Sequence, residues 1–238
     1  MLKALILAGL LAFMPPFDVV APSAVFAEVV ESGDLFRDVM LKFRVGRVEK
    51  GYTVEVLEDY SSDVYRVMTT SGLTGWVSAG MLKIPHDPPT DMSVLPAGSL
   101  ENFVNTKNFE SLTEHLILVD IGRQKVHVFE GQAGAWQLSQ SFDCSTGMNI
   151  SPTTRGEFTL KDRGDWFYSY RLQSGAKYWI RFNGHYLFHT VPMDEDGNKL
   201  EDEDVVGVRR SNGCVRLMVE DMRWIYENID DDTKVIIW

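Results

Sequence analysis

Short apolar segments that alternate with polar residues recur along this chain, and this period-two pattern strongly limits what it can fold into. In the first half the pattern appears at 52–57, 65–68 and 75–77. Successive side chains of a strand point to opposite faces, so alternation is typical of strands with one buried face. Turn residues separate the segments, at Gly46, Gly51, 61–63 and 71–72. The pattern predicts a small antiparallel β-barrel over residues 34–84.

The second half predicts further strands and few helices. Residues 116–119 and 125–129 are apolar or alternating and flank a turn at Gly122, which indicates a hairpin. Apolar residues recur at helical spacing over 219–229, and a last apolar run covers 234–238. The expected fold class is therefore mainly β, and 238 residues are enough for one or two packed domains.

A proline-rich stretch divides the two halves. Residues 85–89 contain three prolines. Proline fixes φ and lacks an N–H donor, so this stretch suits neither a helix nor an inner strand. We expect a linker over 85–98 and a second domain over 99–238, with its core at 115–238 and Ser99 capping a short helix.

Residues 1–27 have the pattern of a secretory signal. Lys3 precedes an apolar run at 4–14, and small or permissive residues end at Ala27. About eleven apolar residues fall short of the roughly twenty that span a bilayer, which favours cleavage after Ala27 over an uncleaved anchor. We therefore expect an exported protein, in the cell wall or outside the cell, without stable membrane insertion after cleavage.

The charge of the chain excludes one class of partner. The formal net charge is −11, so phosphates would be repelled. This argues against nucleic acid and against an anionic membrane surface as partners. The charge says nothing positive about a substrate, and no pattern predicts an oligomeric state.

The strongest chemical signal is a cysteine that follows a glycine. His189 lies twenty-five positions before Cys214, which follows Gly213. A thiolate is the attacking form of cysteine and an imidazole can take its proton, so the pair can be nucleophile and base. Gly213 lacks a Cβ, which permits a sharp turn and lets backbone N–H groups reach an oxyanion. These residues predict a cysteine nucleophile exposed at a turn.

At these residues the chain resembles the L,D-transpeptidases, the cysteine enzymes that cross-link bacterial peptidoglycan. The family signature is a histidine, a spacer, then Ser/Thr-His-Gly-Cys, an apolar residue, and Arg or Asn. The matching residues are Ser211, Gly213, Cys214, Val215 and Arg216. Residues 145–147 and 153–158 resemble two further family blocks, S-T-G and T-P-x-G-x-F. The resemblance runs from 116 to 238 and implies a β-sandwich catalytic domain.

The resemblance also implies roles for these residues. His189 would take the proton of Cys214, and the carbonyl of Thr190 would fix the imidazole tautomer. The N–H groups of Gly213 and Cys214 would stabilise the oxyanion. The implied substrates are peptidoglycan stem peptides, as donor and as acceptor. The implied reaction releases D-alanine, forms a cross-link between third-position stem residues, and needs no cofactor.

The remaining site residues carry open questions. Ser211 and Asn212 would lie beside the oxyanion and the substrate, but Asn212 stands where the family usually has histidine. Two roles are open for Arg216: binding of a substrate carboxylate, or a structural salt bridge. His185 would share a strand face with His189, about 13 Å away, which argues against a zinc site and leaves it a pocket-side or hydrogen-bonded polar residue.

Two other features are expected to have structural rather than catalytic roles. The spacer before Ser211 includes an acidic stretch, 194–204, that lacks the order of a calcium loop and is expected to be a solvated loop. His127 alternates with two valines and is expected at the surface or at a pocket rim.

Two cysteines in an exported chain ordinarily suggest a disulfide. A bridge between Cys144 and Cys214 would remove the nucleophile. We therefore expect two free thiols, with Cys144 a small buried filler.

Three functional hypotheses remain. Residues 34–84 resemble bacterial SH3-like domains, which implies wall binding, although a spacer domain that binds nothing is an equal alternative. The main hypothesis is an L,D-transpeptidase. Water in place of the acceptor amine would make the enzyme an L,D-carboxypeptidase, and a catalytically silent wall-binding protein is the third hypothesis. The presence of both His189 and Cys214 weighs against the silent protein.

Overall fold

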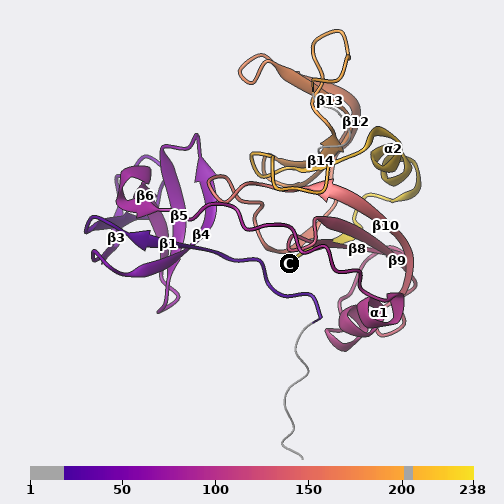
Figure 1. The fold of residues 1–238 in the computed structure, drawn as a ribbon, viewed down its shortest axis with the longest axis horizontal. Helices are drawn as coiled ribbons and strands as arrows, with labels where there is room; N and C mark the ends of the chain where they lie inside the picture. The colour runs from indigo at the N-terminus through magenta and orange to yellow at the C-terminus, as the bar shows by residue number, and fades with distance from the viewer. Residues whose placement is uncertain (1–18, 201–205) are drawn as a thin grey trace, which may run out of the picture.

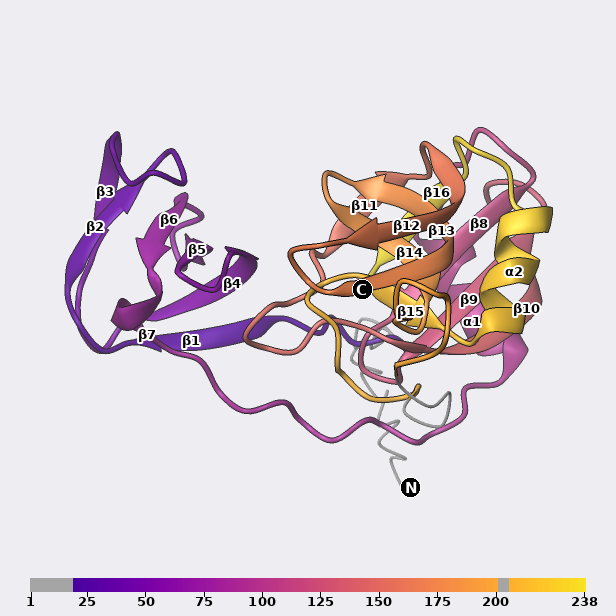
Figure 2. The same cartoon turned by 90° about the horizontal axis from the view of Figure 1, so that it is seen from above.

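Two β-rich domains lie side by side in the computed structural model, which describes residues 19–200 and 206–238. A linker runs along one side of both domains (Figures 1 and 2). Among the described residues, no helix is long and apolar enough to cross a membrane. The mainly β fold class is confirmed.

The smaller domain is one antiparallel sheet of seven strands, in the order β3-β2-β6-β5-β4-β1-β7. Alternation builds its core, because Val54 and Val56 are buried while Glu55 between them is partly exposed. A short 3₁₀ helix, Ala79–Met81, precedes the last strand. The strands are β1 Val25–Val29, β2 Gly33–Phe36, β3 Arg44–Val48, β4 Thr53–Tyr60, β5 Val64–Thr69, β6 Thr74–Ser78 and β7 Leu82–Lys83.

Strand β1 corrects the predicted N-terminal boundaries. It pairs with β4 and β7, and its residues Val25, Ala27 and Val29 are buried in the core of the smaller domain. Cleavage after Ala27 would divide this strand, so the pairing of β1 counts against the predicted cleavage point. The domain starts at Val25 rather than at residue 34. The first eighteen residues of the predicted signal lie outside the described residues.

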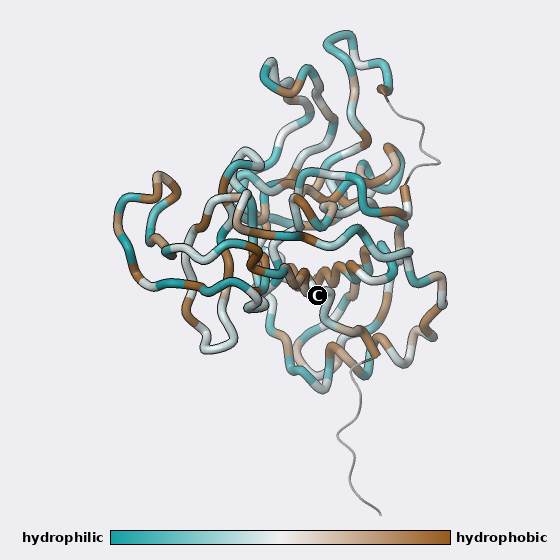
Figure 3. Tube along the Cα trace, turned by 60° about the vertical axis from the view of Figure 1, so that its left-hand side comes forward, coloured by the Kyte–Doolittle hydropathy of each residue, from teal (hydrophilic) through white to brown (hydrophobic). Residues whose placement is uncertain are grey.

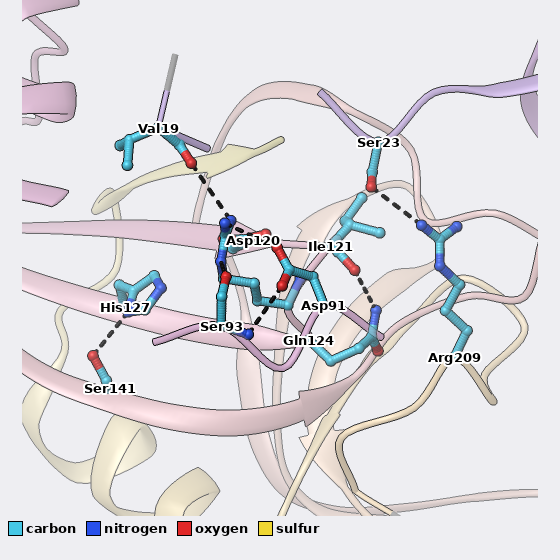
Figure 4. Close-up of polar contacts among 11 residues, drawn as sticks. Val19, Ser23, Asp91, Ser93, Asp120, Ile121, Gln124, His127, Ser141 and Arg209 are labelled. Carbon is cyan, nitrogen blue, oxygen red and sulfur yellow. Dashed lines mark hydrogen bonds and ion pairs between the residues drawn. The ribbon is translucent and has the colours of Figure 1, made fainter. Parts of the chain in front are cut away.

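Residues 19–24 run along the larger domain before they enter β1. Val20 is buried in a core cluster of that domain. Arg209 Nη2 donates to Ser23 Oγ at 3.1 Å, and Arg123 Nη1 lies 3.5 Å from the Val19 carbonyl (Figure 4). These contacts are a further reason why the chain before Ala27 belongs to the fold.

The linker is also held against the larger domain. Asp91 N–H donates to the Gly122 carbonyl at 3.0 Å, and Thr90 Oγ1 donates to the Gly207 carbonyl at 2.8 Å. The helix that follows, α1 (Ala97–Thr106), begins after Pro96, so Ser99 lies inside the helix and the predicted cap is wrong.

The larger domain contains a nine-stranded sheet in the order β11-β16-β8-β9-β10-β15-β14-β13-β12. The strands are β8 His115–Asp120, β9 Lys125–Glu130, β10 Gln137–Ser145, β11 Gly156–Thr159, β12 Arg163–Ser169, β13 Ser174–Asn183, β14 Tyr186–Thr190, β15 Val215–Leu217 and β16 Lys234–Ile237. The long strand β10 pairs with β9 on one side and with β15 on the other, so it joins two halves of the sheet. The predicted hairpin is confirmed as β8 and β9.

The two halves of the sheet enclose the main core. Apolar residues of β8 and β9 meet those of β13, β14 and β15, and the helix α2 (Val219–Asn228) adds Met222 and Ile225. Helix α1 packs on the outer side of β8, through Leu100, Phe103 and Val104. Hydrophobic residues gather in the middle of the larger domain in Figure 3. The β12–β13 hairpin projects from this body (Figure 1).

Candidate active site

Strand pairing brings the predicted nucleophile and base to one face. β14 and β15 are parallel, with Phe188 opposite Val215 and His189 opposite Arg216. Phe188 and Val215 point into the main core. Because side chains alternate, His189, Arg216 and Cys214 belong to the opposite face, on strands about 4.8 Å apart. The parallel pairing of β14 and β15 thus brings His189 and Cys214, which are twenty-five positions apart in the sequence, to one face.

The turn before Cys214 requires glycine. Gly213 has φ 100°, and an added Cβ would lie 2.3 Å from Cε1 of Tyr186. Ser211 is fully buried and ties the turn together, because its Oγ donates to the Cys214 carbonyl at 2.5 Å and accepts from the Gly213 N–H at 3.1 Å. The turn is therefore built by Ser211 and Gly213, while Asn212 is exposed.

These bonds change the expectation for the oxyanion donors. The Gly213 N–H is already occupied by the Ser211 hydroxyl. The Cys214 N–H has no acceptor among the hydrogen bonds of residues 19–200 and 206–238. In this geometry the Cys214 N–H is the donor that is available to an oxyanion.

The Cys214 thiol is half-buried and protonated at rest. It donates to the His185 carbonyl over a distance of 3.9 Å. Burial raises the pKa of Cys214, and the backbone of Leu187 and the cations Arg216 and Arg181 oppose that rise. An uncharged thiol near neutral pH follows, so attack requires removal of the proton.

The imidazole of His189 is neutral. Its Nδ1 lies 2.6 Å from the Thr190 carbonyl, which can only accept, so Nδ1 carries the proton and Nε2 keeps its lone pair. Burial, followed by the nearby Arg216, lowers the pKa of His189 to about 3, while the Thr190 carbonyl works in the other direction. Phe167 packs edge-on against the ring at 5.7 Å. No hydrogen bond between the described residues joins this ring to the Cys214 thiol.

Two residues of the site were not foreseen. Arg181 lies between the core residues Ile180 and Phe182 of β13, so it points to the face of His189. Its Nε donates to Asp162 Oδ1 at 2.8 Å, and its guanidinium lies over the Trp179 ring at 5.6 Å. Alternation along β13 could have found Arg181.

Tyr186 is the second. It is 1% exposed, and its ring blocks the space beside Gly213. Its hydroxyl has no hydrogen-bond partner among the described residues, and burial raises its pKa. No sequence pattern indicated that Tyr186 would meet the turn.

The predicted S-T-G block supports the nucleophile turn through the backbone. Gly147 forms a bridge with Ser211, and the N–H of Ser211 donates to the Thr146 carbonyl at 3.0 Å. Thr146 is fixed in turn by the buried Gln124, which accepts from its N–H at 2.8 Å and donates to its hydroxyl at 2.7 Å. Figure 4 shows Gln124 at the strand edge, bonded to Ile121.

Two expectations about histidines are wrong. His185 lies in the Gly184-His185 turn before β14, not on the strand face, and its ring is exposed and packs at 4.2 Å on Tyr186. His127 is 5% exposed rather than at the surface, and its Nδ1 lies 2.8 Å from Oγ of Ser141, its partner on the neighbouring strand β10. Arg216 is half-buried, and its Nη1 lies 3.5 Å from the Arg210 carbonyl, which leaves both of its roles open.

The prediction for the two thiols is confirmed, and the structure describes part of the acidic stretch. Both cysteines are free, and Cys144 is fully buried, as expected. The described part of the acidic stretch forms a turn in which Asn198 donates to both carboxylate oxygens of Asp194. A cavity of about 460 Å³ separates this turn from the β12–β13 hairpin, with Trp166, Lys177 and Glu195 among its walls.

Comparison with known proteins then places the chain. A profile of the L,D-transpeptidase catalytic domain, YkuD, matches residues 114–237. The chain belongs to this family. Within the L,D-transpeptidases, Bacillus subtilis YciB, whose name assigns it provisionally to this activity, is 36% identical over 126 residues. That match spans 50% of this chain and 63% of the length of YciB.

Solved structures are similar as well. One is a fused Zn-dependent amidase/peptidase/peptidoglycan-binding protein from Clostridium acetobutylicum, with a TM-score of 0.51 and 26% identity over 69% of this chain and 76% of that chain. Another is the L,D-transpeptidase of Stackebrandtia nassauensis, with a TM-score of 0.42 and 21% identity over 59% of this chain and 63% of that chain.

Proposed function

We propose that this protein is a peptidoglycan L,D-transpeptidase that joins third-position stem residues through an acyl-enzyme on Cys214. The observation that carries the proposal is the geometry of the turn. A half-exposed thiol follows an αL glycine, its own N–H has no acceptor among the described residues, and a neutral imidazole shares its face. These are the nucleophile, oxyanion donor and base of acyl transfer.

In the first half-reaction Cys214 replaces D-alanine. The thiol turns from the His185 carbonyl toward His189, whose Nε2 takes the proton as sulfur bonds to the carbonyl carbon of the third stem residue. The Cys214 N–H stabilises the oxyanion. The C–N bond then breaks, and the imidazolium returns its proton to the leaving amine of D-alanine. Because burial and Arg216 disfavour the imidazolium, the proton stays on His189 only briefly.

In the second half-reaction an amine from a neighbouring stem attacks the thioester. Its nitrogen bonds to the carbonyl carbon and His189 takes one of its protons. The carbon–sulfur bond then breaks, and His189 returns that proton to the sulfur to restore the Cys214 thiol. No cofactor enters either step. We assign to Arg181 and Arg216 the carboxylate of the donor stem, because strand alternation places both cations on the face of His189.

The proposal also assigns a location and a role to the smaller domain. The substrate lies in the cell wall, so the protein would act outside the cytoplasmic membrane. The smaller domain, with the pattern of an SH3-like barrel, would hold the enzyme on the wall. Binding of the Cys214→Ala protein to purified peptidoglycan measures this role without catalysis.

Mass spectrometry tests the proposed reaction. Purified protein is incubated with tetrapeptide muropeptides, and Cys214→Ala serves as the matched control. We expect an acyl adduct on Cys214, loss of D-alanine and a dimer linked through third-position residues. Tripeptide without dimer would show hydrolysis, as in an L,D-carboxypeptidase, and would contradict the cross-linking. Absence of any adduct would leave a wall-binding protein and overturn the proposal.

A further inference from the structure

One loop connects the nucleophile turn to the smaller domain. Residues 148–155 follow the S-T-G block and contain no helix or strand. Thr153 Oγ1 donates to the Gly213 carbonyl at 2.8 Å and accepts from the Gly147 N–H at 2.8 Å. The N–H of Met148 donates to the Ser211 carbonyl at 3.1 Å. This loop, named here the floor loop, therefore holds the carbonyls of Ser211 and Gly213 in the turn before Cys214.

The smaller domain holds the other side of the floor loop. Tyr65 of β5 donates from its hydroxyl to the Ile150 carbonyl at 2.8 Å. Asp59 of β4 accepts from the Ser151 hydroxyl at 2.5 Å. Glu55, also in β4, forms an ion pair with Arg155. Tyr65 and Ser151 are 5% and 4% exposed, so these contacts lie in a closed interface rather than on a wet surface.

The linker adds a third hold on the same loop. Asn149 donates from its side chain to the carbonyls of Pro85 and His86, at 3.2 and 3.0 Å. Its N–H donates to Asp87 Oδ1 at 2.5 Å, and Arg209 donates to its side-chain oxygen at 2.9 Å. A loop without regular structure is thus fixed in part by contacts from the linker and the smaller domain.

We infer that the smaller domain is a positioning element of the active site. Tyr65 and Asp59, acting through Ile150 and Ser151, fix the floor loop and thereby the turn that carries Cys214. Acyl transfer is sensitive to this placement, since a displacement of about 1 Å can reduce a rate roughly 100-fold. This role rests on the proposed acyl transfer, and it differs from wall binding because it acts on chemistry in solution.

The inference predicts two opposite changes when the contact is removed. Burial raises the pKa of the Cys214 thiol. A loosened turn lets water reach the sulfur, so the thiolate fraction and the rate of alkylation by iodoacetamide rise. The same loosening misplaces the Cys214 N–H, so the rate of acylation by a tetrapeptide donor falls. A loss of folding does not give this pair of changes, because it also exposes the buried Cys144.

The test compares Tyr65→Phe and Asp59→Ala with two matched controls in the full-length protein. Tyr60→Phe removes the hydroxyl of an exposed tyrosine on the same β4 strand. Asp59→Asn keeps an oxygen for the Ser151 hydroxyl and should restore the wild-type rates. For Tyr65→Phe and Asp59→Ala we expect acylation at saturating donor to fall about tenfold. We expect alkylation of Cys214 to rise about threefold, which corresponds to half a pKa unit. Cys144 should stay protected in every variant.

The alkylation and acylation measurements together separate the inference from the proposed function. Wild-type alkylation of Cys214 in Tyr65→Phe and Asp59→Ala, with Cys144 protected, would overturn the inference whether or not any donor acylates the protein. Wild-type acylation in both variants would overturn it as well. Failure of the wild-type protein to form an acyl adduct would refute the proposed function alone, because alkylation still reports the state of the turn.

Discussion

The two halves of the nine-stranded sheet can be compared through one cysteine and one histidine of each. His127 in β9 and Cys144 in β10 belong to one half, and His189 in β14 and Cys214 before β15 belong to the other. Burial lowers the pKa of His127 to about 4 and that of His189 to about 3, and it raises the pKa of both thiols. The perturbed pKa values therefore do not distinguish the two pairs.

The backbone distinguishes them. Cys144 lies within a strand, opposite Leu217, and is fully buried. Cys214 follows a glycine in the αL region, is half-buried, and keeps its N–H clear of protein acceptors among the described residues. His127 meets a serine hydroxyl, whereas His189 meets a carbonyl that fixes its tautomer. A turn that leaves the thiol partly exposed, rather than a shifted pKa, separates the candidate catalytic pair from the structural pair.

The cysteines give the largest expected contrast. Cys214→Ala should lower acyl-enzyme formation by at least about 10³-fold, because it removes the nucleophile. Cys144→Ala should keep the wild-type acylation rate and cost about 1 kcal/mol of stability. Intact-mass spectrometry and thermal unfolding measure the two effects. Loss of acylation in a folded Cys144→Ala protein would break the contrast.

The histidines give the next contrast. His189→Gln should reduce acylation near pH 7 by about 10² to 10⁴-fold, because no base remains for a thiol that is protonated there. His127→Gln should leave acylation unchanged. Single-turnover acylation, followed by mass, measures both rates. A His189→Gln enzyme with wild-type activity would require another base for Cys214.

Lowering the pH should destabilise the fold, because both histidines are buried in their neutral form. Their folded pKa values, about 4 and about 3, lie below the ordinary 6.5, so the unfolded chain binds more protons between these limits. The stability they contribute is present above pH 6.5 and is lost as pH falls toward the folded pKa. Between pH 6.5 and pH 5 each histidine should add up to about 1.4 kcal/mol per pH unit to that loss. Urea unfolding of His127→Gln at several pH values should show a free energy of unfolding that depends on pH less steeply than in wild type, by up to this amount. An unchanged pH dependence would mean that His127 is hydrated.

The smallest expected effect is at Asn212, the departure from the family signature. Its side chain is exposed and takes no part in the bonds that build the turn. Asn212→His should keep acylation at pH 7 within about twofold of wild type, and should add a titration near pH 6.5 to the rate profile. Acylation measured against pH tests this, and a large loss of rate would show that the amide contributes directly.

Sequence patterns predicted much of the local structure. Alternation foresaw the β8–β9 hairpin and the strands of the smaller domain, and the recurrence of apolar residues foresaw α2. The family was recognised from three short blocks, because a nucleophile turn needs particular residues at fixed spacing. The same alternation rule, applied to β13, would have located Arg181.

The predictions that failed depend on contacts between distant segments. Ala27 has the composition of a cleavage site, yet it is buried because β1 pairs with β4 and β7. His127 was expected outside because its neighbours face inward, but the second face of its strand is covered as well. A single strand cannot show whether a second layer packs on it.

The sequence by itself determined which residues can do the chemistry, since a thiol, an imidazole and a glycine before the cysteine are properties of residue type and spacing. Only the tertiary structure decided which backbone donor is available, where the smaller domain begins, and that Tyr65 and Asp59 hold the floor loop. The start of the smaller domain and the hold on the floor loop depend on groups that are distant in sequence, up to 92 positions apart for Asp59 and Ser151. Hydrogen bonds at that separation form only when the whole chain has packed, so no local pattern encodes them.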